Sequence, residues 1–302
     1  MSRKRILIIH NPTSGRRRAD FMASVAVALT GLGARVDIRV TEGFGHATQL
    51  AASLEPDTQD CIVAAGGDGT VNEVLNGLAK LEDAPPLGVI PLGTANVLAL
   101  ETAYPKKPAD IARVLFAAPA RPLFPGILRQ NGSDKRLFAL MVGVGLDARI
   151  VAGVSPSLKR LMGKGAYGIE TAYQWLKGGL PDYDIAIDGK DYTAGSIIIT
   201  NGRLYAGKFV VAPDADIGVS GFKVLLLKGN RTSILANAAA MAAGALSRKK
   251  GVRVIEAKEI TISGPAGEPV QADGDLLGRL PVTIAAAAKP VMIIAPDQIK
   301  LH

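Results

Sequence analysis

The sequence predicts an α/β protein in two parts, a doubly wound parallel-sheet domain over residues 1–122 and an antiparallel, β-rich domain over residues 123–302. Two observations predict this division. Strand and helix signals alternate over the first part, which is typical of a parallel sheet with helices on both faces. Beyond Pro119, Pro122 and Pro125 the strand signals lie closer together with turns between them, which is typical of antiparallel sheets.

In the first part, each short β-branched run is followed by a turn and then by apolar residues at helical spacing. Phe21, Val25 and Leu29 share one face of the first helical pattern, which ends at Gly31 and Gly33. The expected strands cover residues 5–9, 35–40, 61–65 and 87–91, and the expected helices cover residues 19–32, 47–53 and 71–80 and begin again near Ala95.

The second part contains mostly short strand signals. We place the boundary near residues 121–124, and the extreme C-terminus is free to pack back on the first domain. The expected strands are 123–130, 136–142, 184–187, 196–200, 221–227, 252–257, 259–263, 270–272, 282–286 and 291–295, and two helical inserts cover residues 157–175 and 232–247.

Composition excludes several classes of protein. Apolar residues make up 48% and charged residues 21%, which is typical of globular domains and not of disordered or coiled-coil chains. A single cysteine, Cys61, and three scattered histidines argue against a disulfide framework or a Cys/His metal site. Lys and Arg number 35 against 27 Asp and Glu, and the resulting charge of +8 favours an anionic partner. No apolar run is long enough for an export signal or a membrane span, so we expect a cytoplasmic protein.

The strongest local motif is Gly66-Gly67-Asp68-Gly69-Thr70, which lies between a buried strand and a helix. Glycines let the backbone turn sharply and approach a ligand, and the N–H groups at a helix N-terminus attract phosphate. An acid inside such a loop would repel phosphate unless a cation accompanies it, so Asp68 indicates Mg²⁺–nucleotide chemistry. The alternative is a tight strand–helix turn with Asp68 as the N-cap.

Two further turns follow expected parallel strands of the same sheet. One covers residues 11–15 and the other covers residues 91–96, and both are rich in small and hydroxyl-bearing side chains. Ligands of open parallel sheets bind beyond the carboxyl ends of the strands. We therefore expect the three turns to form one phosphate-binding cleft.

These turns carry a family resemblance. They read Asn11-Pro12-x-Ser14-Gly15, Gly66-Gly67-Asp68-Gly69-Thr70-Val71-Asn72-Glu73 and Pro91-Leu92-Gly93-Thr94-Ala95-Asn96. They resemble the signature stretches of the diacylglycerol kinase catalytic domain, whose superfamily includes soluble bacterial lipid kinases, sphingosine kinases and ceramide kinases. The resemblance continues at Val144-Gly145-Leu146-Asp147-Ala148, at Lys159-Arg160-x-x-Gly163-x-x-Ala166-Tyr167 and at Asp273-Gly274-Asp275.

The resemblance implies an N-terminal domain related to NAD kinases and phosphofructokinases, a C-terminal β-sandwich-like domain, and ATP with Mg²⁺ in the cleft between them. It makes Asp275 the expected proton acceptor. Asp68 would orient the Mg²⁺–phosphates, as a metal ligand, or share the proton transfer. The residues expected to bind ATP are Asn11, Pro12, Thr13, Ser14, Gly15, Thr41, Gly66, Gly67, Asp68, Gly69, Thr70, Val71, Asn72, Glu73, Gly93, Thr94 and Asn96.

These roles suit phosphoryl transfer to an alcohol. An alcohol is a poor nucleophile, so a carboxylate beside it must take the proton as it attacks. The transfer otherwise needs alignment and charge neutralisation by Mg²⁺ and N–H groups. Without the resemblance, Asp273-Gly274-Asp275 is more readily explained as a β-turn between strands.

Two departures from the family pattern affect acids near the expected site. Asp275 stands where the family usually has Glu, so its reach is one methylene shorter. Many relatives have an acid where this chain has Val97, and Glu101, one helical turn further on the same face, is expected to substitute for it in part. We expect either a compensating movement of the loop or altered activity.

A third departure concerns a structural metal. The bacterial enzymes of the family hold a structural Mg²⁺ on a loop that reads roughly Asp-Asp-Gly, where this chain has Val219-Ser220-Gly221. Without a carboxylate at Ser220, a hard cation is not expected there. The matching ligand positions are Ile217, Ser220 and Phe222, and the nearby acids Asp214 and Asp216 are candidate replacements for the missing carboxylate.

The function expected from the sequence is ATP-dependent phosphorylation of a hydroxyl on a diacylglycerol-like or related lipid. The alternatives are a kinase of a soluble substrate such as NAD, and a nucleotide- or lipid-binding relative with weakened catalysis. We expect peripheral binding at an anionic membrane surface, since a lipid substrate requires it and basic residues cluster along the chain. Nucleic acid is not an expected partner, and β-edges of the second domain could pair in a homodimer. The clusters are 16–18, 159–164 and 248–250.

Overall fold

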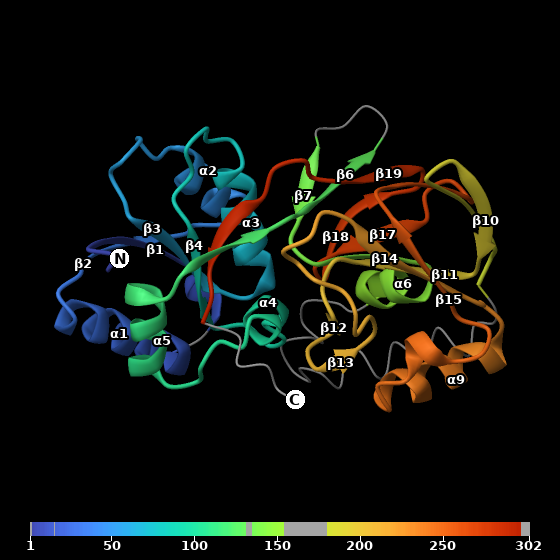
Figure 1. Ribbon diagram of the computed structural model, residues 1–302, viewed down its shortest axis with the longest axis horizontal. Helices are drawn as coiled ribbons and strands as arrows, with labels where there is room; N and C mark the ends of the chain where they lie inside the picture. Colours follow the sequence, from blue (N-terminus) through green and yellow to red (C-terminus); the bar gives the residue numbers. More distant parts are fainter. Residues whose placement is uncertain (1, 15, 131–134, 154–179, 297–302) are drawn as a thin grey trace. The chain divides into compact units, whose positions relative to one another are not determined.

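The computed structural model describes residues 2–14, 16–130, 135–153 and 180–296 (Figure 1). It divides into two compact units, Met1–Leu123 with Lys289–His302, and Phe124–Ala288. The chain leaves the first unit within the 121–124 stretch and returns to it near Lys289. Gly15, the helix expected at 157–175 and the basic motif at 159–167 lie outside the described residues.

The first unit is built on a mixed sheet of the order β2-β1-β3-β4-β20-β5. All neighbouring strands run parallel except β20 and β5, which are antiparallel. The strands are β1 (Arg5–His10), β2 (Arg35–Val40), β3 (Cys61–Gly66), β4 (Leu87–Pro91), β5 (Ala120–Leu123) and β20 (Val291–Ile294).

Helices cover both faces of this sheet (Figure 1). On one face, Ile6 and Ile8 of β1 share a core with Val25 of α1 and Ile111 of α5. On the other face α2 and α3 pack closely, since a Cβ on Gly77 would lie 2.5 Å from the Thr48 carbonyl oxygen. The helices are α1 (Arg16–Gly31), α2 (His46–Ala52), α3 (Asp68–Leu78), α4 (Val97–Glu101) and α5 (Pro108–Ala117), with the short 3-10 turn η1 (Pro12–Ser14).

The two strand expectations near the boundary have different outcomes. The strand expected at 291–295 is β20, and it packs back on the first domain, as allowed for the C-terminus, by inserting between β4 and β5 of the first sheet. The strand expected at 123–130 begins only at Gly126, as β6, because the chain turns at Phe124 and Pro125, and Leu123 is instead the last residue of β5 in the other sheet. Strand signals in the sequence report burial and alternation but not the partner strand, so the position of β20 between β4 and β5 was not visible from the sequence.

The second unit is a sandwich of two antiparallel sheets. In the described residues their orders are β10-β9-β16-β19-β6-β7 and β15-β14-β11-β8-β17-β18. One core lies between the sheets and includes Ile185 and Ile284 from the first and Ile197 and Val224 from the second. The strands are β6 (Gly126–Gln130), β7 (Arg136–Phe138), β8 (Met141–Val144), β9 (Tyr183–Ile187), β10 (Lys190–Ala194), β11 (Ser196–Thr200), β14 (Phe222–Leu227), β15 (Arg253–Ala257), β16 (Glu259–Ser263), β17 (Pro269–Ala272), β18 (Asp275–Arg279) and β19 (Val282–Ala286).

Smaller elements surround this sandwich. A second cluster packs Leu246 and Val211 on the other face of β11 and β14, against Ile198 and Leu225. The helix expected at 232–247 ends at Ala242, because Gly244 adopts a φ of 65° and closes it. These elements are α6 (Leu146–Gly153), β12 (Leu204–Tyr205), β13 (Phe209–Val210), α9 (Arg231–Ala242) and η2 (Leu246–Arg248). No helix in the described part of the chain has the length and apolarity needed to cross a membrane.

Candidate active site

The parallel strands of the first unit bring four loops to one edge of the sheet. His10 pairs with Val40 and Ala65, and Gly66 pairs with Pro91, so β1 to β4 end at the same level. The Asn11 N–H donates to the Ala65 carbonyl at 3.0 Å, and the Thr41 N–H donates to the His10 carbonyl at 2.9 Å. The loops that follow these strands therefore begin side by side, as the three motifs predict.

Side-chain hydrogen bonds join these loops to one another. Asn11 Nδ2 donates to Thr70 Oγ1 at 3.2 Å, and Asn11 Oδ1 accepts from the Thr13 hydroxyl at 2.8 Å. Asn96 clamps its own loop, since its Oδ1 accepts the Gly93 N–H at 2.7 Å and its Nδ2 donates to the Gly93 carbonyl at 2.9 Å. The amides of Asn11 and Asn96 thus fix the shapes of the first and third turns.

Glycine is required where the second and third loops touch. A Cβ on Gly93 would lie 2.5 Å from the Gly67 Cα, and a Cβ on Gly67 would lie 3.2 Å from the Gly93 Cα. A Cβ on Gly66 would lie 2.3 Å from Thr70 Oγ1. Side chains at these positions would push the loops apart, so the glycines keep two backbone segments in contact at the sheet edge.

Asp68 links the same two loops through its carboxylate. The N-cap of α3 is Gly67 rather than Asp68, and Asp68 is the first helical residue. Its Oδ1 accepts the Val97 N–H at 2.7 Å, at the start of α4. The N-cap alternative is therefore wrong for α3, although Asp68 caps the neighbouring helix. In a helix that begins at Asp68, the N–H groups of the first turn have no intrahelical acceptor and point toward the loop edge.

Glu73 has a different position from the other loop residues. Its two carboxylate oxygens accept the N–H groups of Gly45 at 3.0 Å and Ala47 at 3.1 Å, at the N-terminus of α2. The Thr48 hydroxyl donates to the Glu73 carbonyl at 2.9 Å. In this structure the Glu73 carboxylate therefore holds α2 on α3.

The remaining predicted residues lie on the same edge or in the first turns of α3. Thr70, Val71 and Thr41 are buried, and Asn72 accepts a hydrogen bond of 2.6 Å from the Asn76 amide. Glu101, the acid proposed to replace the one missing at Val97, is buried in α4 with 4% of its surface exposed. Pro12, Thr13 and Ser14 form η1, Gly69 lies in the first turn of α3, and Thr94 lies within the third loop.

In the second unit, Asp273, Gly274 and Asp275 join β17 to β18. Ala272 pairs with Asp275, and Asp273 and Gly274 have φ angles of 48° and 88°, so they form a two-residue hairpin turn. The β-turn explanation is therefore correct as geometry. The Asp273 carboxylate accepts the N–H groups of Ala139, Leu140 and Met141 at 2.5, 2.9 and 3.0 Å, while Asp275 is exposed at the start of β18.

One residue at the base of this hairpin carried no sequence signal. Gln271 is buried, with 2% of its surface exposed, and its Oε1 accepts the Gly274 N–H at 2.9 Å. A glutamine in a strand is ordinarily a surface residue, so only its burial in the structure identifies it.

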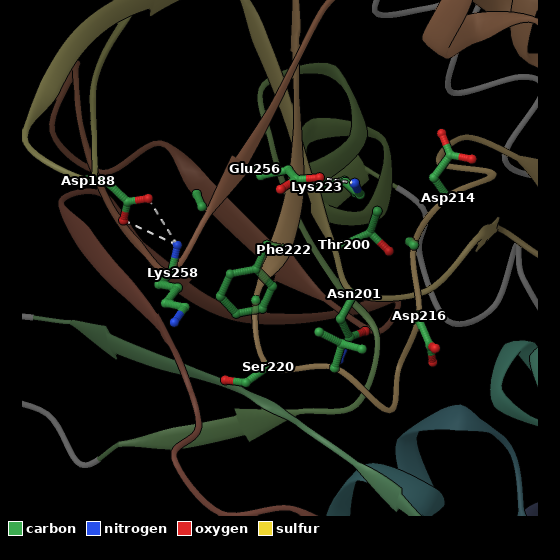
Figure 2. A pocket seen from close by; sticks show the side chains of 14 residues that line it. Asp188, Thr200, Asn201, Asp214, Asp216, Ser220, Phe222, Lys223, Glu256 and Lys258 are labelled. Atoms are coloured by element: carbon green, nitrogen blue, oxygen red, sulfur yellow. Dashed lines mark hydrogen bonds and ion pairs between the residues drawn. The ribbon is translucent and has the colours of Figure 1, made fainter.

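The loop that would carry the structural Mg²⁺ of the family does not fit a metal. The Ile217 carbonyl accepts the Phe124 N–H at 2.8 Å, and the Ser220 hydroxyl donates to the Ala287 carbonyl at 3.1 Å. Asp214, Asp216 and Ser220 line a cavity of about 410 Å³. Figure 2 shows the Ser220 side chain pointing away from the carboxylates of Asp214 and Asp216. The described residues contain no cluster of three acids, histidines or cysteines suited to a metal ion. The role of Asp214 and Asp216 as replacements for the missing carboxylate stays a prediction.

Comparisons with known families cover almost the whole chain. The family model "Diacylglycerol kinase catalytic domain" matches residues 5–125, and "YegS C-terminal NAD kinase beta sandwich-like domain" matches residues 140–300. The chain belongs to the diacylglycerol kinase family. The resemblance read from the motifs is thereby confirmed, as is the pairing of an α/β domain with a β-sandwich-like domain.

Individual members of the diacylglycerol kinase family align over their full length. A diacylglycerol kinase of Bacillus subtilis (strain 168) is 29% identical over 303 residues, covering 98% of this chain and 97% of its own. A diacylglycerol kinase of Staphylococcus aureus (strain MRSA252) is 27% identical, covering 98% and 94%. A crystal structure from Bacillus anthracis str. Sterne superimposes with a TM-score of 0.82 at 24% identity, covering 98% and 97%, and supports the fold. The family is one of phosphotransferases.

Proposed function

We propose that this chain transfers the γ-phosphoryl group of ATP to a hydroxyl of diacylglycerol or a related lipid. The observation that carries the proposal is the contact between two glycine loops at the sheet edge, joined by Asp68. Membership of the diacylglycerol kinase family supports the reaction class. The substrate, the nucleotide and the metal are part of the proposal.

The first unit supplies the phosphate-binding groups. First-turn N–H groups of α3 and the backbone of Gly66, Gly67 and Gly93 fit a polyphosphate chain, because nothing larger than hydrogen projects from those glycines. Thr70 is held by Asn11, and Asp68 is held at Val97. A Mg²⁺ ion accompanying the nucleotide would neutralise phosphate charge, and Asp68, whose carboxylate contacts the third loop at Val97, is the proposed carboxylate ligand.

The second unit supplies the proton acceptor. Asp275 takes the proton of the lipid hydroxyl while the hydroxyl oxygen attacks the γ-phosphorus of ATP. The bond from the γ-phosphorus to the β–γ bridging oxygen breaks, and the products are a lipid phosphomonoester and ADP. Asp273 is excluded from this role because three backbone N–H groups occupy its carboxylate. The turn therefore presents one reactive acid rather than two.

Access to the lipid requires a membrane surface. The formal charge of +8 favours anionic lipid, and each basic residue near such a surface contributes about 1 kcal/mol. We propose reversible peripheral docking on the cytoplasmic leaflet. Dimerisation through edge strands such as β10 or β15 belongs to the same proposal, because both end a sheet of the second unit.

The test is transfer from radiolabelled ATP to a panel of acceptors: diacylglycerol, phosphatidylglycerol, sphingosine, ceramide and NAD. We expect a labelled lipid, and we expect Asp68→Asn and Asp275→Asn each to lower turnover by roughly 10²- to 10⁴-fold. Asp191→Asn, an exposed acid on β10, is the matched control and should keep wild-type turnover. Labelled NAD alone would establish the soluble-substrate alternative, and ATP binding without any product would establish the weakened relative.

A further inference from the structure

A chain of hydrogen bonds runs through the second unit to the Asp273–Asp275 turn. The Tyr205 hydroxyl on β12 donates to one carboxylate oxygen of Asp147, and Gln271 Nε2 donates to the other. The opposite end of the same amide, Gln271 Oε1, accepts the Gly274 N–H at 2.9 Å. The chain therefore ends at the residue immediately before Asp275.

Space for this chain is built into strand β8. A Cβ on Gly143 would lie 2.0 Å from Asp147 Oδ2 and 2.7 Å from Gln271 Nε2. Any other residue at 143 would displace the carboxylate from the amide. The absence of a side chain there leaves a cradle that the Asp147–Gln271 pair fills.

The Asp147 carboxylate determines which way the Gln271 amide faces. A carboxylate accepts hydrogen bonds, so the NH₂ group of the amide must point to Asp147 and its oxygen must point to Gly274. Gln271 has 2% of its surface exposed, so water does not compete for either end. Burial raises the pKa of Asp147, and the hydrogen bonds from Tyr205 and Gln271 oppose that rise.

We propose that Gln271 is a positioning residue for Asp275, oriented by Asp147 and Tyr205. The inference rests on the proposed function, in which Asp275 is the proton acceptor. Two anchors hold the turn: Asp273 is bound by the N–H groups of residues 139–141, and Gly274 is bound by Gln271. An aspartate reaches one methylene less far than a glutamate and has less freedom to correct a displaced backbone. The backbone position of residue 275 should therefore affect turnover more strongly than it would with a glutamate at that position.

The experiment measures kcat and the KM for ATP in Gln271→Met, which keeps the side-chain volume and removes both hydrogen bonds. We expect kcat to fall by roughly 10- to 100-fold, with the KM for ATP unchanged, since the nucleotide loops lie in the other unit. Gln130→Met is the matched control. Gln130, on β6, also accepts a backbone N–H through its Oε1, at 3.2 Å from Arg279, which lies at the opposite end of β18 from Asp275. The control should keep wild-type kcat.

A double-mutant cycle separates positioning from stability. If Gln271 acts through Asp275, Gln271→Met should cause no further loss in the Asp275→Asn background. A multiplicative loss in that background, or wild-type kcat in Gln271→Met, would overturn the inference while leaving the proposed function standing. Wild-type turnover in Asp275→Asn would instead contradict the assigned base.

A second variant covers the case in which Gln271→Met does not fold. Tyr205→Phe removes only the hydroxyl at the start of the chain of hydrogen bonds and keeps the ring. We expect kcat to fall by roughly 3- to 10-fold with the KM for ATP unchanged, and the loss to vanish in the Asp275→Asn background. Unchanged kcat in Tyr205→Phe, or a loss that persists without Asp275, would count against the proposal.

Discussion

Gly67 and Gly93 show how the absence of a side chain creates the candidate phosphate site. Each glycine leaves room for the backbone of the other loop, and neither has the positive φ that would explain it by conformation alone. Asp68 and Asn96 then hold the two loops by hydrogen bonds. At this scale the sequence motif and the structure agree, because a glycine pattern directly reports where backbone segments approach one another.

Gly93→Ala should therefore abolish ATP binding while most of the fold persists. The added methyl group, 2.5 Å from the Gly67 Cα, must separate the loops and should cost about 1–3 kcal/mol of stability. Titration calorimetry with ATP measures the binding, and Gly31→Ala, where a Cβ meets nothing within 4 Å, is the control. Wild-type affinity in Gly93→Ala would place the nucleotide elsewhere.

Glu268 provides a pH-dependent test at the same scale. Its carboxylate accepts hydrogen bonds from Arg149 at 2.7 Å and from the Tyr183 hydroxyl at 2.9 Å, and Arg149 lowers the pKa of Glu268 below its ordinary value of 4.5. Stability from this pair is complete above pH 4.5 and is lost as the pH falls through the lowered pKa. The free energy of unfolding, measured with urea at a series of pH values below 4.5, should fall less steeply with decreasing pH in Arg149→Met than in the wild type. The same pH dependence in the variant and the wild type would contradict a stabilising role for the Arg149–Glu268 pair.

Among the elements, α2 depends on a residue of another helix. Its N-cap, Gly45, has no side chain to accept the first N–H groups of the helix, and Glu73 of α3 accepts them instead. The sequence motif includes Glu73, but nothing in the motif shows that its partner is backbone 26 to 28 residues away. The long-range partner is the part of the role that sequence reasoning could not supply.

Glu73→Ala should destabilise the first unit by about 1–2 kcal/mol, because two N–H groups at the start of α2 lose their acceptor. Denaturant unfolding measures the change. Glu82→Ala, at an exposed position, should shift stability by less than about 0.5 kcal/mol and serves as the control. Equal effects of the two substitutions would show that the cap contributes nothing.

The same limit explains which elements the sequence predicted well. The strands at 35–40, 61–66 and 87–91 and their helices follow from local alternation and turn residues. For β20 the sequence allowed a return to the first domain but did not give its neighbours, because its partner β4 lies far from it in sequence. Gln271 was missed for the related reason that burial of a polar residue is a tertiary property.

On the scale of the whole molecule, the chain crosses between the units twice, and the residues of the second unit at both crossings are hydrogen-bonded to one loop. Phe124 donates to Ile217, and the Ser220 hydroxyl donates to Ala287, at the first and the second crossing respectively. These bonds use the Ile217 carbonyl and the Ser220 side chain, two of the positions at which relatives would hold Mg²⁺. Hydrogen bonds of the chain itself stabilise this loop.

Chelation should accordingly leave nucleotide-free protein unchanged. We expect the Tm to be the same with EDTA as with Mg²⁺, and Ser220→Ala to lower stability by about 0.5–1.5 kcal/mol through loss of one hydrogen bond. Calorimetry measures both, and elemental analysis should find no bound Mg²⁺. A Tm that rises with Mg²⁺ in the absence of nucleotide would contradict the metal-free loop.

Membrane docking predicts a dependence on salt. Activity on vesicles that contain anionic lipid should fall as the ionic strength rises, because the Debye length shortens from about 10 Å at 0.1 M to about 3 Å at 1 M. Activity on a short-chain, water-soluble diacylglycerol is the control and should change little. Equal salt dependence for the two substrates would argue against electrostatic docking.

The most direct test follows phosphorus NMR of the protein with ATP, Mg²⁺ and vesicles that contain diacylglycerol. The account predicts that a lipid phosphomonoester and ADP accumulate together in equal amounts, and that both signals disappear in Asp275→Asn. ADP accompanied by inorganic phosphate alone, or a phosphomonoester that persists at the wild-type rate without the Asp275 carboxylate, would contradict it.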